Sequence, residues 1–278
     1  TDVHLGQRQR LLQLSDRLSD KEVLEQLLEA LEETPLRPPQ TDLHELLGQL
    51  KPNALESVLK WIGKSRNTEL RALLESAASK LASGHTAELV RLISSDDEIV
   101  AFEAVRRAGA MKTGAAVSAL TGTIQHGSPE MRLASVAALS EIASPGALQV
   151  LERALEDEDR DIRIATVRVL GLKQHRGALR PIEAHLRSKG LREGTLAEKM
   201  AFFETYGILC GDEGVPMLAE ILNTRRRLLG GREDGELRAC AAMALGKIGT
   251  DKAMGALQKA LADRDVIVRN AVSRAVRG

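Results

Sequence analysis

The residue types that bind metals or transfer protons are thinly spread along this sequence. The six histidines are His4, His44, His85, His126, His175 and His185. No two of them stand three or four residues apart, the spacing that would place two imidazole groups on one face of a helix beside a metal ion. The pattern therefore predicts no metal site and no bound cofactor.

Two further features could support chemistry, but neither has a complete pattern. Residues 63–65 read Gly-Lys-Ser, like the end of a phosphate-binding loop, but that motif needs a preceding strand and a glycine where this chain has Val58. Cys210 and Cys240 form neither a metal-ligand spacing nor a disulfide framework. We expect Cys240 to be an inert core residue and Cys210 to be unreactive. These residues predict a protein that is not an enzyme.

The composition favours helices that pack closely through small and branched side chains. Of the 278 residues, 43% are hydrophobic but only 2% are aromatic, so Leu, Ala, Val and Ile must build the core. Lysine plus arginine and aspartate plus glutamate both number 39, which gives a net charge of zero. The chain as a whole therefore has no electrostatic bias toward nucleic acid or an anionic membrane.

The sequence predicts a cytoplasmic location. The lack of a disulfide framework is typical of a reducing compartment. No run approaches the roughly 18 apolar residues of a membrane span, and the first residues lack the basic and apolar regions of a signal peptide. The chain starts with Thr1 instead of Met, as a fragment of a longer protein would.

One motif recurs along the chain from about residue 67. Residues 159–165 read Asp-Arg-Asp-Ile-Arg-Ile-Ala, in which a capping residue is followed by an aliphatic and then a basic residue. Aligned on the basic residue, the copies lie 29 to 39 residues apart, at Arg71, Val100, Arg132, Arg163, Lys199, Arg238 and Arg269. Residues of N-cap type stand four positions earlier, at Asn67, Asp96, Ser128, Asp159, Thr195, Asp234 and Asp265. Because Arg163 recurs in nearly every copy, we expect it to be a structural contact between neighbouring repeats.

Each copy predicts a helical hairpin of about 31 residues. The first helices should end near Leu139, Leu170, Gly207 and Leu245, with Gly171 and Gly246 directly after two of these leucines. A second helix with its own apolar face follows, and such hairpins must stack to bury their faces. We predict an all-α fold: a right-handed α-solenoid of about six hairpins over residues 66–278, ending in a single helix, with the second helices lining a concave surface.

Residues 1–65 are expected to form an irregular helical cap packed on the solenoid. Val23, Leu24 and Leu28 give one helix an apolar face, and prolines within residues 34–40 end it. Two more helices should follow, one capped by Thr41 and one around Leu59. Strong apolar faces imply burial against the repeats, so we expect no independent domain here.

Residues 159–165 and 237–250 resemble the bacterial HEAT repeats, including the related repeats named after phycobilisome lyases. The resemblance extends over about residues 67–278 and implies a protein-interaction scaffold most often, with enzymes in a few branches. The iron-dependent deoxyhypusine hydroxylases need several His-Glu steps, but only His44-Glu45 is present. Nothing beyond the repeat points to a bilin lyase. A HEAT-like DNA glycosylase needs a basic concave surface with aromatic walls, whereas Trp61 and Tyr206 are far apart in a neutral chain.

Two insertions interrupt the repeats, around residues 187–195 and 224–234. Insertions in solenoids often fall on the binding face. Residues 160–232 contain 14 Lys or Arg against 8 Asp or Glu, whereas residues 1–65 contain 8 against 11. The arginines of the second insertion could bind carboxylates or phosphates, although arginine-rich loops are also typical of a solvated surface.

The repeat between the insertions is unusual. Glu198 stands where an aliphatic residue is expected, and Phe203 and Tyr206 should fill core positions. Phe202 replaces a small residue of the other repeats, so it either packs under an insertion or is exposed to a partner.

The leading prediction is a non-enzymatic scaffold or adaptor that binds another protein, or another domain of its own chain, through the concave face and the two insertions. Nucleic-acid binding through the arginine-rich loop is the alternative, and no membrane contact is expected. The predicted partner-binding residues are Gln149, Glu152, Arg153, Arg180, Glu183, Arg187, Phe202, Arg225, Arg226, Arg227, Arg232, Gln258 and Lys259.

Overall fold

The computed structural model describes residue 13 and residues 15–33, 38–224 and 235–277. In this part of the chain the regular elements are α-helices and short 3-10 turns, and it contains no strand. The predicted all-α fold is confirmed. The α-helices are α2 (Lys21–Glu33), α3 (Gln40–Leu47), α4 (Leu55–Lys64), α5 (Thr68–Gly84), α6 (Thr86–Leu92), α7 (Glu98–Ala110), α8 (Val117–His126), α9 (Pro129–Ile142), α10 (Pro145–Arg153), α11 (Arg160–Leu172), α12 (Leu179–Leu186), α13 (Lys189–Glu193), α14 (Leu196–Cys210), α15 (Val215–Asn223), α16 (Gly235–Ile248), α17 (Asp251–Gln258) and α18 (Val266–Arg277). The 3-10 turns are η1 (Pro52–Ala54), η2 (Gly114–Ala116), η3 (Ala154–Glu156), η4 (Arg176–Ala178) and η5 (Gly211–Gly214).

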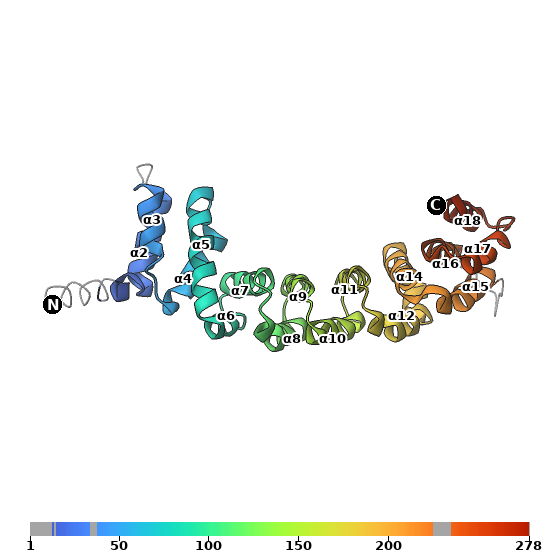
Figure 1. The fold of residues 1–278 in the computed structure, drawn as a ribbon, viewed down its shortest axis with the longest axis horizontal. Coiled ribbons are helices and arrows are strands. Elements are labelled where there is room, and N and C mark those ends of the chain that lie inside the picture. Colours follow the sequence, from blue (N-terminus) through green and yellow to red (C-terminus); the bar gives the residue numbers. More distant parts are fainter. Residues whose placement is uncertain (1–12, 14, 34–37, 225–234, 278) are drawn as a thin grey trace. The chain divides into compact units, whose positions relative to one another are not determined.

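The chain forms two compact units, residues 1–147 and 148–278, and each is described by itself. The predicted boundary between residues 65 and 66 falls inside the first unit. Helices alternate between two sets that build the hairpins of an α-solenoid (Figure 1). The first helices are α5, α7, α9, α11, α14, α16 and α18, and the second helices are α6, α8, α10, α12, α15 and α17.

N-cap residues start most of the first helices at the predicted positions. Side-chain oxygens accept hydrogen bonds from backbone N–H groups of the following turn at Asn67, Ser128, Asp159, Thr195 and Asp265. The cap predicted at Asp96 is wrong by one residue, because Asp97 caps α7. The aligned residue of this repeat is therefore Ala101 instead of Val100. The predicted cap Asp234 lies outside the described residues.

The repeated arginine is a structural residue, as predicted for Arg163. Arg163 Nη1 donates to the carbonyl oxygen of Asp157 at 2.7 Å, and Arg238 Nε donates to that of Leu222 at 2.8 Å. The arginine thus ties the start of a first helix to carbonyl groups that the preceding repeat leaves without helical partners. Contacts of the same kind join Arg71 to Ile62 and Arg269 to Asp263.

The first-helix pairs α7–α9, α14–α16 and α16–α18 come into close contact at small residues. A Cβ atom built on Gly207 of α14 would lie 2.7 Å from the carbonyl oxygen of Ala244 in α16, closer than such atoms can approach. α11 ends at Leu172 and α16 at Ile248, close to the predicted ends near Leu170 and Leu245, so Gly171 and Gly246 lie inside the last turns of these helices. Similar close approaches occur at Gly109, where a Cβ atom would lie 2.7 Å from Ala138 Cα, and at Gly246, where it would lie 2.8 Å from Ala275 Cβ.

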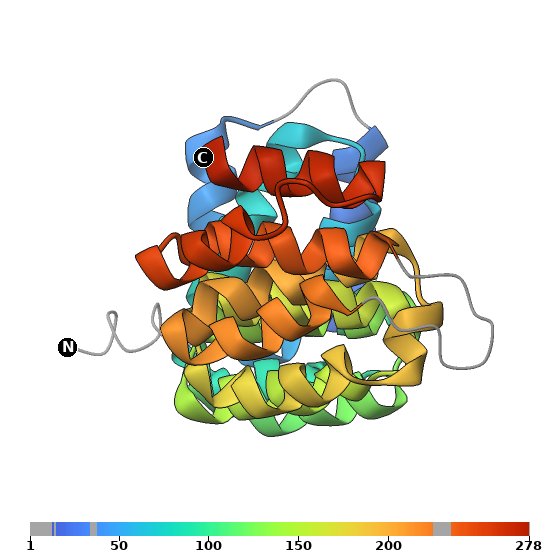
Figure 2. The ribbon, with the colours of Figure 1, turned by 90° about the vertical axis from the view of Figure 1, so that its right-hand side faces the viewer.

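The second helices of neighbouring repeats are further apart than the first helices. In the second unit α14 packs extensively on α16, and α16 on α18, whereas α15 and α17 touch only briefly. Figure 2 shows these C-terminal helices stacked one above another. In the first unit α7 packs extensively on α9, but α6 and α8 make no comparable contact. The prediction that second helices line the concave surface is therefore wrong, because first helices form the inner side within each unit.

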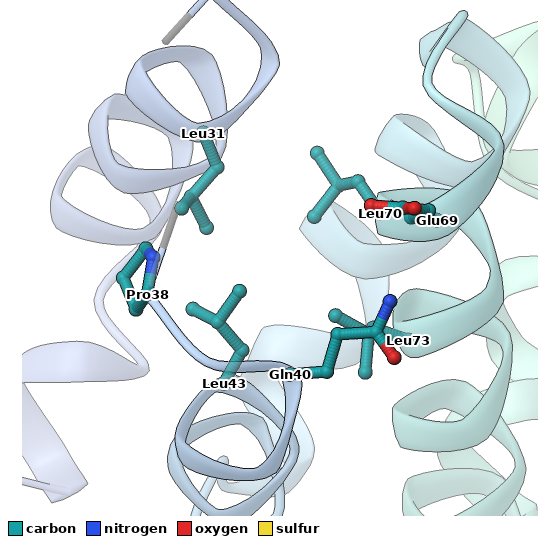
Figure 3. A pocket seen from close by; sticks show the side chains of 7 residues that line it. All are labelled: Leu31, Pro38, Gln40, Leu43, Glu69, Leu70 and Leu73. Atoms are coloured by element: carbon teal, nitrogen blue, oxygen red, sulfur yellow. The ribbon is translucent and has the colours of Figure 1, made fainter. Parts of the chain in front are cut away.

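The first unit begins with helices that differ in detail from the prediction. α3 starts at Gln40 after Pro39 without a side-chain cap, so the predicted cap at Thr41 is wrong. A cavity of about 90 Å³ lies where α2 and α3 face α5, and Figure 3 shows the side chains that line it. Its lining is mostly leucine, so it belongs to the apolar contact between these helices. The lining residues are Leu31, Pro38, Gln40, Leu43, Glu69, Leu70 and Leu73.

Ion pairs fix α7 to the helices before it. Lys60 Nζ of α4 lies 2.9 Å from Asp97 Oδ2, and their hydrogen bond raises the pKa of Lys60 and lowers the pKa of Asp97. Arg107 of α7 pairs with Glu75 of α5 and donates to Ser79 Oγ at 2.7 Å. The N-terminal helices are thus joined to the repeats by charge as well as by apolar packing.

Candidate functional site

Exposed large apolar side chains gather on the first helices of both units. Among the described residues from α7 to α18, every such side chain except Leu261 lies on a first helix, and none lies on a second helix. Together they define what we call the first-helix face, an apolar surface on each unit. Its residues are Ile99, Phe102, Leu133, Leu172, Leu196, Met200, Ile208, Met243, Val266 and Ile267.

In the first unit this face contains a groove of about 490 Å³, which we call the α7–α9 groove. Phe102 and Ile99 of α7 are 39% and 37% exposed. The volume lies within the range of sites that hold small molecules or a few partner side chains. The lining residues are Gly63, Arg71, Glu98, Ile99, Phe102, Glu103, Ser128, Glu130 and Met131.

In the second unit two methionines occupy the first-helix face. Met200 of α14 and Met243 of α16 are 37% and 40% exposed, on helices that pack against each other. The same two helices are joined by Lys247 Nζ, which lies 3.1 Å from Glu204 Oε1. Because methionine side chains are flexible and polarisable, they adapt well to the surface of a partner.

The second unit also buries a charged cluster. Glu198 is only 2% exposed, and its Oε1 accepts a 2.6 Å hydrogen bond from Arg163 Nε and lies 3.5 Å from His185 Nε2. The His185 ring stacks on Phe202, with ring centroids 4.1 Å apart. Burial lowers the pKa of His185, although the Glu198 carboxylate opposes the shift. The cluster joins α11, α12 and α14, so its charges serve packing between repeats.

Other polar groups of the unusual repeat have structural partners too. The Lys199 ammonium, on a side chain 5% exposed, lies 3.1 Å from Glu236 Oε2 of α16. Tyr206 Oη donates to Glu183 Oε2 at 3.5 Å, and burial raises the pKa of the Tyr206 phenol well above its usual range. These contacts tie α14 to the helices on both sides of it.

The aromatic residues of this repeat lie in the core. Phe203 and Tyr206 are 1% and 4% exposed, which confirms the prediction for both. Phe202 is 0% exposed and stacks on His185. Its predicted exposure to a partner is therefore wrong, because the bulky ring fills space that small residues leave open in the other repeats.

The predicted partner-binding residues on the second helices lie away from the first-helix face. Glu152 pairs with His175, and Glu183 accepts a 2.9 Å hydrogen bond from Arg187, so these side chains have partners within the chain. Binding by this set stays a prediction. Exposed side chains are found at Gln149, Arg153, Arg180, Arg187, Gln258 and Lys259.

Of the two insertions, the structure describes the first, around residues 187–195, but not the arginines of the second. The first is not only a loop, because Ser188 caps the short helix α13 and Leu191 is buried at 0% exposure. The arginine-rich loop, with Arg225, Arg226, Arg227 and Arg232, lies outside the described residues. Nucleic-acid binding through that loop stays a prediction.

The described residues contain no arrangement typical of a metal site or a membrane span. No group of three or more His, Cys, Asp or Glu side chains among them is arranged to hold a metal ion. No helix in the same residues is both long and apolar enough to cross a membrane.

Comparison with protein families identifies the repeat. Residues 86–171, which extend from α6 into α11, match the family described as HEAT repeats. The chain therefore carries HEAT repeats, as the sequence resemblance predicted. A comparison with curated proteins found no match.

Several solved structures are similar to this chain at low identity. The complex of CpcE and CpcF of phycocyanin lyase from Nostoc sp. PCC7120 is 19% identical over 67% of this chain and 73% of the other, with a TM-score of 0.45. Human deoxyhypusine hydroxylase is 20% identical over 80% and 96%, with a TM-score of 0.32. A designed armadillo repeat protein is 17% identical over 91% and 98%, with a TM-score of 0.33. These likenesses carry no conclusion about activity or partners.

The sequence contained a signal for the first-helix face that the predicted residue set missed. In the corrected register Phe102, Leu133 and Met200 all stand one position after the aligned residue. Apolar residues recurring at an exposed position indicate a binding face. This recurring apolar position could not be assigned to a binding face from the sequence, because the sequence does not show which layer of helices faces inward.

Proposed function

We propose that this chain is a non-enzymatic scaffold that binds another protein, or another domain of its own chain, through the first-helix face. The observation that carries the proposal is the one-sided distribution of exposed apolar side chains between first and second helices. Monomeric proteins rarely expose extended apolar surface without a partner to cover it.

The state of the nucleophilic and charged groups also supports a scaffold. Burial raises the pKa of the Cys210 thiol to about 11, and the side chain is only 3% exposed, so it is a poor nucleophile. The buried charges Glu198 and Lys199, which precede Met200 in α14, have partners in neighbouring repeats. These groups support packing and suggest no reaction.

The proposal is tested with two matched double variants of the full chain. Met200→Glu/Met243→Glu places two carboxylates on the first-helix face, and Gln149→Glu/Gln258→Glu adds the same charge to the second helices. A partner is captured from the source cells with the unaltered chain and identified by mass spectrometry. Its affinity for each variant is then measured by titration, and circular dichroism checks that both variants fold.

The methionine variant should weaken binding at least about tenfold, because two desolvated apolar contacts are replaced by charges. The second-helix variant should bind within about twofold of the unaltered chain. The reverse order of effects would assign binding to the second helices and would overturn the proposal.

A further inference from the structure

We propose that the α7–α9 groove binds a segment of the partner protein in which a large apolar side chain is flanked by lysine or arginine residues. The proposal rests on the proposed function and deepens it by naming the chemistry of the partner.

The apolar part of the groove is suited to hold an anchor residue. The chain has three phenylalanines. Phe202 and Phe203 are at most 1% exposed, whereas Phe102 is 39% exposed in the groove. Ile99 lines the groove next to Phe102. Its side chain packs on Gly63 of α4, where an added Cβ atom would be only 2.4 Å from Ile99 Cγ2. Exposed aromatic surface next to an aliphatic side chain is typical of a central binding contact.

The charged part of the groove favours a basic segment. Its lining contains three carboxylates, Glu98, Glu103 and Glu130, against one guanidinium, that of Arg71. Arg71 Nε donates to the carbonyl oxygen of Ile62 at 3.1 Å, so part of this guanidinium already serves the fold.

The three carboxylates of the groove are not equally available to bind a partner. Glu103 is buried and accepts a 2.9 Å hydrogen bond from Arg106 Nε. Glu98 and Glu130 are exposed in the first turns of α7 and α9. The helix dipole stabilises negative charge in a first turn, which explains why Glu98 and Glu130 stand at these helix positions. It does not explain why both carboxylates line the same groove as Phe102. Two exposed carboxylates next to an apolar anchor site complement a partner with the opposite charge.

This charge pattern also separates partner classes. An acidic peptide would bring its carboxylates toward Glu98 and Glu130 and would be repelled. The phosphates of a nucleic acid would be repelled for the same reason. A basic segment would bind with an association rate that falls as salt is added.

The chemistry is tested by selecting short random peptides displayed on phage against the full chain, after depletion on the Phe102→Ser variant. The proposal predicts enrichment of peptides with a large apolar residue flanked by Lys or Arg. Enrichment of acidic or neutral peptides, or no enrichment after depletion, would overturn it. Self-association of the chain that is lost in Phe102→Ser would assign the groove to a second copy and would also overturn it.

Variants of the carboxylates test the charge directly. Glu98→Gln/Glu130→Gln should weaken a selected peptide about fivefold to tenfold in a fluorescence anisotropy titration, since two exposed ion pairs are lost. Glu141→Gln/Glu220→Gln neutralises two exposed carboxylates elsewhere and should leave affinity within about twofold. Equal affinity for all three proteins would contradict the proposed charge complementarity.

Failure of the groove proposal can be distinguished from failure of the proposed scaffold function. If the peptide results fail while Met200→Glu/Met243→Glu still weakens binding of the captured partner, the scaffold function stands and only the groove assignment is wrong. If neither surface affects partner binding, the proposed function itself is wrong.

Discussion

Arg238 and Asp263 form an ion pair in which both side chains are 4% exposed. Arg238 also reaches the carbonyl oxygen of Leu222, so one side chain links a first helix to the repeats on both sides. Such a pair contributes little net stability compared with apolar packing, but removing one partner leaves the other charge buried without this counter-charge. The charged residues of the first helices therefore fix the register of the stack.

This role predicts a large effect of Arg238→Met. The free energy of unfolding should fall by about 3 kcal/mol, because the Asp263 carboxylate stays buried without its guanidinium. Equilibrium unfolding in urea measures the change. The control is Arg264→Met at an exposed position, which should change the free energy by less than about 0.5 kcal/mol.

A second substitution tests whether the buried Asp263 charge causes the loss of stability in Arg238→Met. Asp263→Asn, added to Arg238→Met, removes the charge but keeps the oxygen that accepts from the backbone N–H of Asp265. The double variant should therefore be more stable than Arg238→Met alone. If it is less stable, buried charge is not the reason for the loss.

His185 predicts a pH dependence of stability. Because burial lowers its pKa in the folded chain, the unfolded chain binds the proton more tightly. Stability from this group is present above the ordinary pKa of about 6.5 and is lost as the pH falls through that value toward the lower folded pKa. The groups facing the imidazole are Glu198, Arg163 and Glu156.

The prediction is checked by urea unfolding at about pH 7.5 and about pH 5.5. His185→Gln should lose less stability between these two values than the unaltered chain, because the titrating group is gone. His126→Gln, at an exposed position, should behave like the unaltered chain. A steeper loss in His185→Gln would contradict the direction of the pKa shift.

At the scale of elements, small residues decide how closely the first helices pack. Substituting Gly207 by alanine gains about 1 kcal/mol of helix propensity, but the new Cβ meets the backbone of Ala244 at 2.7 Å. The contact is with a carbonyl oxygen and not with a flexible side chain, so α14 and α16 would have to separate.

Gly207→Ala should therefore lower the free energy of unfolding by about 1–3 kcal/mol. The matched control is Gly255→Ala in α17, where a Cβ meets nothing within 4 Å, and it should raise the free energy by up to about 1 kcal/mol. Thermal unfolding followed by circular dichroism measures both. Equal stabilisation by the two substitutions would show that the first helices are not in tight contact.

The sequence predicted most of these elements because cap, aliphatic and basic residues recur together. Its error of one residue at α7 has a simple reason: Asp96 and Asp97 are both good caps, and the choice depends on contacts such as that of Asp97 with Lys60. The glycines directly after the predicted helix ends, Gly171 and Gly246, lie inside the last turns of α11 and α16. Glycine favours both helix ends and close helix contacts, and only the packing tells them apart.

At the scale of the whole molecule, the HEAT-repeat architecture could be predicted from the sequence but the binding face could not. The apolar positions show which residues are buried in a hairpin. They do not show which layer of helices packs more tightly, and this decides whether first or second helices face inward. Phe202 shows the same limit, since a large side chain at a small-residue position can point outward or fill the core.

The central claim is that the first-helix face of this neutral chain meets its partner. The most direct test places a photoreactive amino acid at Met243, with Gln258 on α17 as the control position, and irradiates the full chain in its source cells. The account predicts a crosslinked partner from Met243 and none from Gln258. Crosslinking from Gln258 alone would contradict the account and assign binding to the second helices.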